Sequence, residues 1–254
     1  MEYFVKKESI VRDIWGKSDT ILLIFAGAAA EFALSKAVDW LYFTGKIPKD
    51  PLGRLFSTVT YARDIVFSEK DKAYQSIQAI NHIHAYVEKE RQSTIPEWAY
   101  KHVLYMLIDY SIRSYSLMER ELTMTEKQEV LKVFCEVGSK MGINNLPNTF
   151  ERFEIERHQQ LQTDLKYSEY SEDLYKQYRK HLGFVRYKLL LETQKILLPD
   201  AVRQLLNFKK VSIMGMLVSF YKFLRMINLN DLLKSLILPS EYKKEIRMLD
   251  NFST

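Results

Sequence analysis

Apolar residues recur at intervals of three and four along nearly the whole chain, and no stretch shows sustained two-residue alternation. The 254 residues include only eight glycines and six prolines, so few positions interrupt this pattern. The sequence therefore predicts an all-α fold, with residues 1–254 forming a single, mostly helical domain. There is no internal repeat and no low-complexity segment, which disfavours a solenoid.

Helix ends are indicated by side-chain oxygens before a first turn and by glycine or proline after a last one. The expected helices span residues 51–67, 69–90, 96–120, 124–142 and 149–165, followed by shorter ones divided at Gly183, Pro199, Asn228–Asn230 and Pro239. The N-terminal caps are assigned to Asp50, to Ser68, to Thr123 with Glu126 at capping-box spacing, and to Asn148 or Thr149.

The single cysteine, Cys135, excludes a disulfide framework and any zinc or iron–sulfur site built from several thiolates. Among its apolar neighbours an inert buried thiol is favoured over a haem ligand. Lys and Arg exceed Asp and Glu by 37 − 32 = 5, spread along the chain. Because nucleic-acid binders concentrate their charge on one element, we expect no nucleic-acid partner, and at most weak contact with a membrane surface.

The longest apolar run, residues 20–34, contains Glu31 and is shorter than the roughly 20 residues that span a bilayer. We interpret it as a buried core helix. A second run, 211–221, is followed by Lys222 and Arg225, and a packed helix is favoured there over one lying on a membrane. The chain starts without the charged-then-apolar order of a signal peptide, so we expect a cytoplasmic protein, with a membrane-peripheral location as the alternative.

A histidine interrupts the apolar stripe of the expected helix 69–90, which consists of Ala73, Ile77, Ile80, His84 and Val87. His82, by contrast, falls on a face that water reaches. An imidazole facing a core needs partners, because an unpaired buried polar group costs about 1–3 kcal/mol. The residues alone favour a core histidine bonded to a carbonyl or a side chain, and they leave a metal or cofactor ligand open.

Arg54 and Thr58 lie one turn apart on the expected helix 51–67, beside its apolar face. A guanidinium and a hydroxyl at this spacing can hold an anionic or oxygen-rich ligand. The residues alone favour the competing interpretation, a surface arginine and a threonine that bonds back to the helix. Asp39 and Asp109 are carboxylates in apolar surroundings, either perturbed acids or helix-to-helix anchors, with the anchor favoured for Asp109.

Asp50 to Thr58, DPLGRLFST, resembles the D-P-x-G-R-L-x-x-T segment of the MpaB-type oxygenase and rubber oxygenase (latex-clearing protein) catalytic-domain family. His84-Ala85-Tyr86-Val87 resembles the H-A-x-V segment of the same family. Further matches follow in chain order, at residues 107–109, 122–126, 137–147 and 197–199. The likeness covers about residues 15–208, which leaves 209–254 as a C-terminal helical extension.

The resemblance implies a helical domain with a non-covalent haem b in an apolar pocket between helices. Characterised members of the family cleave carbon–carbon double bonds of isoprenoid chains with dioxygen. Carried over, His84 would be the proximal iron ligand, and Arg54 and Thr58 would lie beside the haem as cofactor-binding and catalytic groups. The implied protein is a haem-dependent oxidoreductase, an oxygenase of a hydrophobic, unsaturated small molecule. Peroxidase or peroxygenase chemistry would use the same ligand.

Three features depart from the family pattern. Ser57 stands where the rubber oxygenases carry a lysine, Asp39 is only a loose match for their distal glutamate, and Gly27-Ala28 replaces a His-Pro pair found in many relatives. These departures make the rubber polymer a poor candidate substrate. Two other classes stay open, a helical haem- or lipid-binding protein without turnover and a membrane-peripheral interaction protein.

Overall fold

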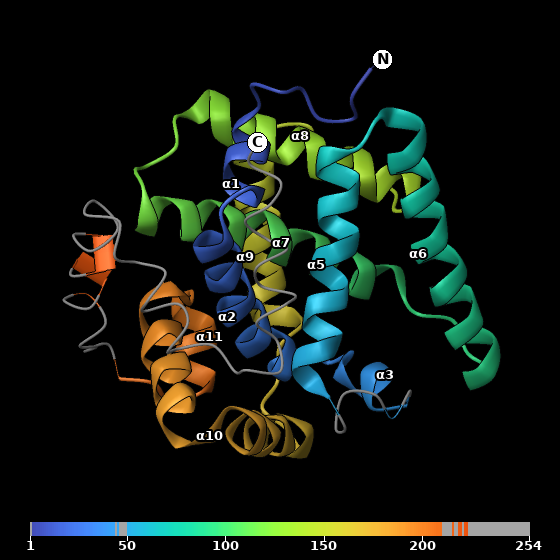
Figure 1. Cartoon of the computed structure of the whole chain (residues 1–254). Helices are drawn as coiled ribbons and strands as arrows, with labels where there is room; N and C mark the ends of the chain where they lie inside the picture. The colour runs from blue at the N-terminus through green and yellow to red at the C-terminus, as the bar shows by residue number, and fades with distance from the viewer. Residues whose placement is uncertain are drawn as a thin grey trace.

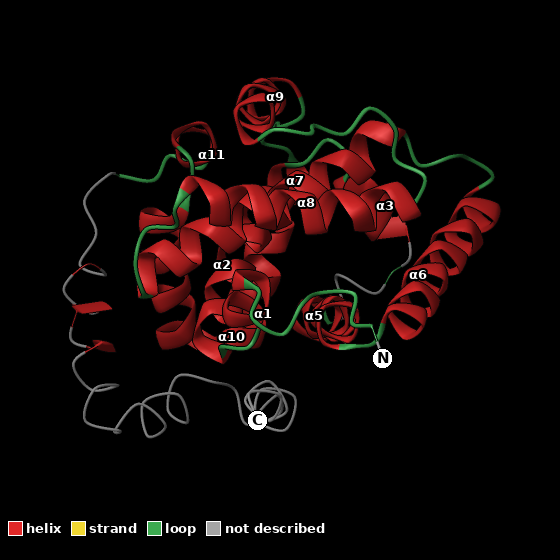
Figure 2. Ribbon diagram, turned by 90° about the horizontal axis from the view of Figure 1, so that it is seen from above, coloured by secondary structure: helices red, strands yellow, loops and turns green. Residues whose placement is uncertain are grey.

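The computed structural model describes residues 2–43, 45, 50–209, 215, 218–219 and 221–222, with all side chains inside the helices except those of residues 41, 51, 52 and 54–57. The described residues form ten helices and no strand, apart from two isolated bridges (Figure 2). The predicted all-α fold is therefore confirmed.

The helices are, in chain order, α1 (Ile10–Trp15), α2 (Ser18–Leu34), α3 (Val38–Phe43), α5 (Pro51–Phe67), α6 (Lys70–Arg91), α7 (Glu97–Met118), α8 (Met124–Lys140), α9 (Phe150–Thr163), α10 (Glu169–Leu197) and α11 (Asp200–Leu205). From α5 to α9 these bounds follow the predicted ranges closely. Most of the second apolar run, 211–221, and most of the predicted extension 209–254 lie outside the described residues, as do the expected breaks at Asn228–Asn230 and Pro239.

Three predicted N-terminal caps are confirmed, because the side chains of Asp50, Thr123 and Thr149 accept hydrogen bonds from the first turns of α5, α8 and α9. The cap at Ser68 is wrong by one residue, since Glu69 precedes α6 and makes no side-chain cap. The N-terminal segment causes the shift. Phe4 N donates to the Ser68 carbonyl at 3.3 Å, which leaves Ser68 in a short pairing with another part of the chain.

The central helix is α2, which packs against α7, α10, α1 and α11 (Figure 1). Its alanine-rich sequence lets these neighbours approach closely on several sides. The ring of Tyr110 on α7 lies directly over Gly27, where an added Cβ would be 2.3 Å from the ring carbon Cδ1. The prediction of a buried core helix over residues 20–34 is confirmed.

The helices α5 and α6 form an antiparallel pair that turns at Ser68 and Glu69, with α6 at the edge of the molecule (Figure 1). Helices α9 and α11 lie on the opposite side from α5 (Figure 2). The buried residues of α6 are Ala73 and Ile77, both near its start. Within the described parts of the chain, we find no helix with the length and hydropathy needed to cross a bilayer.

Candidate functional site

The first turn of α5 is fixed by Asp50, whose Oδ1 accepts a 2.8 Å hydrogen bond from Gly53 N. A Cβ at position 53 would lie 2.0 Å from Asp50 Oδ2, so any larger residue there would displace the capping carboxylate. The D-P-x-G part of the motif is thus a helix start, and it places Arg54 and Thr58 one turn apart. Thr58 is half-buried, while the side chain of Arg54 lies outside the described part of the structure.

The apolar stripe of α6 is covered at one end only. Ala73 and Ile77 are 0% and 1% exposed, whereas Ile80, His84 and Val87 are half-buried. His82 is exposed, as its position on the helix predicts. His84 therefore lies where the stripe passes from the packed core to a partly open surface, and it is not a fully buried core histidine.

Tyr100, in the first turn of α7, packs edge-on against His84 with the ring centroids 5.1 Å apart. Its hydroxyl donates to Glu88 Oε1 at 3.4 Å, and Ile95 N donates to the same oxygen at 2.7 Å. Burial, reinforced by the Glu88 carboxylate, raises the pKa of Tyr100 to about 12. Glu88 thus stabilises the connection between α6 and α7. Tyr100, its hydrogen-bond partner, stays protonated, and the Tyr100 ring packs against the His84 imidazole.

A second contact holds the C-terminal end of α6 to α3. Arg91 Nη2 donates to Asp39 Oδ2 at 2.6 Å, and its guanidinium lies 4.0 Å from the centroid of the Trp40 ring. Both side chains of the ion pair are partly exposed, so the pair contributes modestly to stability. Asp39 is therefore held by an arginine at the edge of the α5–α6 pair.

Helix geometry places the carried-over residues at one level. Arg54 lies 14 residues before Ser68 and His84 lies 16 residues after it, so at 1.5 Å per residue both positions are about 21–24 Å from the turn between α5 and α6. Thr58 lies one helical turn closer than Arg54 to the connection at Ser68 and Glu69. The two helices contact each other, with Ile65 packed against Ala73 and Ile77 near the turn, and they diverge away from it (Figure 1). The N-terminal half of α5 and the half-covered part of the α6 stripe are therefore at the same level of the helix pair, at the end where the two helices diverge.

The surroundings of His84 suit a haem ligand. His84 stands on an apolar stripe that the protein covers incompletely, and its Nδ1 is shielded from solvent. Among the described residues, no three His, Cys, Asp or Glu side chains form a cluster that could bind a metal ion. A single histidine is the protein ligand that haem iron requires in many haem proteins.

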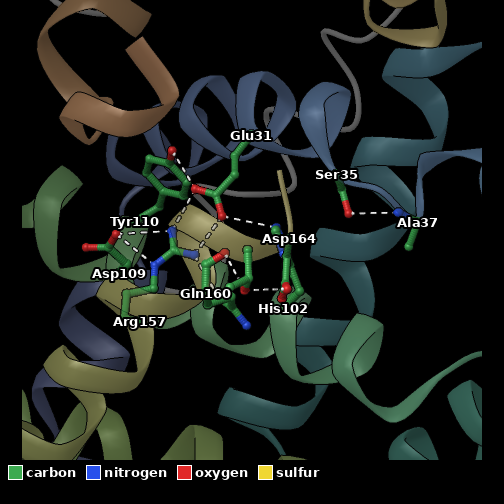
Figure 3. A network of polar contacts seen from close by, with 10 residues as sticks. Glu31, Ser35, Ala37, His102, Asp109, Tyr110, Arg157, Gln160 and Asp164 are labelled. Atoms are coloured by element: carbon green, nitrogen blue, oxygen red, sulfur yellow. Dashed lines mark hydrogen bonds and ion pairs between the residues drawn. The ribbon is translucent and has the colours of Figure 1, made fainter. Parts of the chain in front are cut away.

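A separate network of charged residues lies in the core between α2, α7 and α9 (Figure 3). Glu31 is 0% exposed and receives two 2.6 Å hydrogen bonds from the Arg157 guanidinium, together with one of 3.0 Å from the Tyr110 hydroxyl. Arg157 also donates to Asp109 Oδ2 at 3.2 Å, which confirms Asp109 as a helix-to-helix anchor. No side chain that the structure describes on α5 or α6 belongs to this network.

His102 joins the network from α7. Its Nε2 lies 3.1 Å from Glu31 Oε1, and its Nδ1 lies 3.8 Å from Asp164 Oδ2 (Figure 3). Burial is the largest influence and favours the neutral imidazole, but the Asp164 and Glu31 carboxylates outweigh it and raise the pKa of His102. Burial likewise opposes the Glu31 carboxylate, yet Arg157 and His102 together lower the pKa of Glu31 to about 2. The network therefore links α2, α7 and α9 through buried ion pairs.

Sequence reasoning did not find this network. Glu31 was visible as a charge inside an apolar run, and Asp109 as a carboxylate in apolar surroundings. Arg157 and His102 gave no such signal, because their local sequences do not mark them as buried. A buried carboxylate requires a cation, and this requirement is the signal that could have prompted a search for one.

The family model for the catalytic domain described as ER-bound oxygenase mpaB/B'/rubber oxygenase matches residues 15–229. This chain belongs to that family. The match covers most of the chain and extends past residue 208, where the sequence analysis ended the family-like core. Comparisons with curated proteins and with solved structures give no match. Membership of this MpaB/rubber oxygenase family indicates an oxygenase-type catalytic domain.

Two departures from the MpaB/rubber oxygenase pattern have a structural context. Gly27, in place of a histidine found in many relatives, is the residue on which the Tyr110 ring packs. Asp39, the loose match for the distal glutamate, is ion-paired with Arg91. The side chain of Ser57, in place of the lysine, is outside the described part of the structure.

Cys135 is the remaining side chain that was considered as a ligand. It is half-buried, and its Sγ lies 3.6 Å from the Pro147 carbonyl oxygen. Burial raises the pKa of the thiol to about 11, so it stays protonated at neutral pH. A protonated thiol is a poor iron ligand, in agreement with an inert cysteine in this MpaB/rubber oxygenase domain.

Proposed function

We propose that this chain is a haem b-dependent oxygenase that uses dioxygen to cleave a double bond in a hydrophobic, isoprenoid-like small molecule. The proposal rests on the position of His84 in a member of the MpaB/rubber oxygenase family. His84 lies on an apolar stripe that is buried at Ile77 and partly exposed towards Val87. A fully packed stripe would leave no site for a large planar ligand, and a fully polar one would not bind it.

In this proposal His84 would hold the haem iron, and Arg54 and Thr58 would act on the same group from the neighbouring helix α5. When bound, haem supplies a redox-active iron that allows one dioxygen molecule to replace a C=C bond by two carbonyl groups. The Arg54 guanidinium and the Thr58 hydroxyl orient oxygen or a haem propionate through charge-assisted and neutral hydrogen bonds.

The remaining residues of the region position and shield the site. Glu88 keeps the Tyr100 hydroxyl engaged, so the Tyr100 ring restricts rotation of the His84 imidazole. The apolar side chains Ile80 and Val87 exclude water and favour an apolar substrate over a polar one. Arg91 contacts Asp39 and Trp40, and these contacts keep the C-terminal end of α6 close to α3.

A visible spectrum of protein purified from haem-replete cells tests haem binding. We expect a Soret band in the natural chain and in His82→Ala, which removes the exposed histidine two residues away, and loss of the band in His84→Ala. A band that survives His84→Ala would contradict the assigned ligand. Colourless protein that cannot be reconstituted would instead favour a membrane-peripheral interaction protein.

Dioxygen consumption with an unsaturated terpenoid separates an oxygenase from a non-catalytic haem- or lipid-binding protein. We expect turnover by the haem-loaded protein and a lower rate for Arg54→Ala and Thr58→Val at equal haem content. An unchanged rate in Arg54→Ala would refute the role given to that residue. Haem binding without any consumption of dioxygen would favour the non-catalytic protein.

A further inference from the structure

Helix α10 bends sharply at Gly183, which has φ 72° and ψ 176° inside an otherwise helical segment. These angles suit glycine, since a side chain is strained in this region of φ/ψ space. The predicted division at Gly183 is thus present as a corner between two helical arms, at the lower edge of the molecule in Figure 1.

Both arms of α10 are fastened to the central helix α2. Ser171 Oγ and the Tyr178 hydroxyl, from the first arm, donate to the carbonyls of Ala33 at 2.6 Å and Ala29 at 3.3 Å. In the second arm, Gln194 Nε2 donates to the carbonyl of Ala26 at 2.9 Å. The corner between the arms is therefore held in place by the core of the protein.

The corner exposes two adjacent apolar side chains. Phe184 is 64% exposed and Val185 is 70% exposed. Single exposed apolar residues are ordinary, but here an aromatic and a branched aliphatic residue follow directly after the bend of a rigidly held helix. Both side chains therefore face solvent at the corner.

Basic residues flank this apolar pair in the sequence. Residues 174–191 contain no aspartate or glutamate and five basic residues, Lys176, Arg179, Lys180, Arg186 and Lys188. Arg179, Lys180 and Lys188 are exposed, and Lys188 Nζ lies 5.8 Å from the centroid of the Phe184 ring. Lys176 is ion-paired with Glu172, so it contributes least to the free charge.

We propose that this α10 corner docks on the surface of a bilayer that contains anionic phospholipids. Phe184 and Val185 enter the boundary between headgroups and acyl chains, and Arg179, Lys180 and Lys188 meet the phosphate and carboxylate groups of the lipids. Two apolar side chains bury far less surface than the roughly 800 Å² per partner of a stable protein interface. A bilayer, by contrast, accommodates a small protruding wedge. The proposal does not depend on haem binding or on oxygenase activity.

Co-sedimentation of the full chain with lipid vesicles tests this surface. We expect binding to phosphatidylcholine vesicles with about 30% phosphatidylserine, weaker binding to phosphatidylcholine alone, and weakening by salt. The double variant Phe184→Ser/Val185→Ser should bind at least about tenfold more weakly. The triple variant Arg179→Gln/Lys180→Gln/Lys188→Gln should lose most of the preference for phosphatidylserine.

The matched control is Ile155→Ser. Ile155 on α9 is 70% exposed, like Val185, but it lies between Glu154 and Glu156, so its removal should leave vesicle binding unchanged. Absence of vesicle binding by the natural chain, or equal binding by the double variant, would overturn the proposal. Self-association that the double variant abolishes, without vesicle binding, would assign the corner to a second copy of the chain instead. Circular dichroism confirms that each variant is folded.

Discussion

The charged network of the core and the His84 region place polar groups in opposite surroundings. At the network, Glu31 and Arg157 are 0% and 4% exposed, and the guanidinium is satisfied by carboxylates from two other helices. At His84, the imidazole lies on a half-covered stripe with one aromatic neighbour from α7. Buried ion pairs therefore hold α2, α7 and α9 together, whereas α6 is attached mainly near its start and at its end.

The largest effect on stability is expected for Arg157→Met. The substitution leaves Glu31 and Asp109 without their guanidinium, so the free energy of unfolding should fall by about 3–5 kcal/mol, as measured by urea denaturation. The control Arg152→Met lies on the same helix and removes an ion pair with Glu156 at the surface. It should cost less than about 1 kcal/mol. Equal losses in the two variants would break the contrast between buried and exposed pairing.

Acid should weaken the network next. The folded-state pKa of Glu31, about 2, lies below the ordinary 4.5, so its contribution to stability is present above pH 4.5 and is lost as the pH falls towards 2. The shift corresponds to a loss on the order of 3 kcal/mol. Urea denaturation at pH values between 2 and 5 measures it. A free energy of unfolding that stays constant over this range would contradict the assigned pairing.

His102 gives the opposite dependence on pH. Its pKa is raised above 6.5 in the folded protein, so its contribution is present below pH 6.5 and is lost as the pH rises through the folded-state value. Stability should therefore be highest between about pH 4.5 and 6.5. The variant His102→Gln should remove the decline on the alkaline side. If that decline persists unchanged in His102→Gln, another group causes it.

A smaller effect is expected where α2 and α7 touch. Gly27→Ala places a methyl group against the Tyr110 ring and should lower the free energy of unfolding by about 1–3 kcal/mol. Combining it with Tyr110→Leu should cost less than the sum of the two single changes, because the smaller side chain relieves the overlap. Strict additivity in this double-mutant cycle would show that the two residues do not press on each other.

The smallest effect is expected at the half-covered end of α6. In haem-free protein, His84→Ala should change the free energy of unfolding by less than about 1 kcal/mol, because little packing is lost at a partly open surface. Ile77→Ala, on the same stripe but 1% exposed, should cost about 2–5 kcal/mol. A loss at His84 as large as that at Ile77 would mean that the stripe is packed along its whole length.

Local patterns predicted most of the helices and singled out His84. Capping at Asp50 and Thr123 involves residues a few positions apart, and a histidine inside an apolar stripe is visible from the sequence of one helix. The contacts of Arg157 with Glu31 were not predictable in this way, because the two residues are 126 positions apart. The start of α6 was misplaced for the same reason, since the pairing at Ser68 comes from the N-terminus.

The contact between Gly27 and Tyr110 makes the side-chain sizes at these two positions depend on each other. A relative with histidine at the position of Gly27 needs space where the tyrosine ring lies here, so it must have a smaller residue at the position of Tyr110 or a wider separation of the two helices. With a smaller residue there, Glu31 would also lose the hydroxyl that donates to it. We therefore expect residues 27, 31 and 110 to be exchanged as a set among homologues.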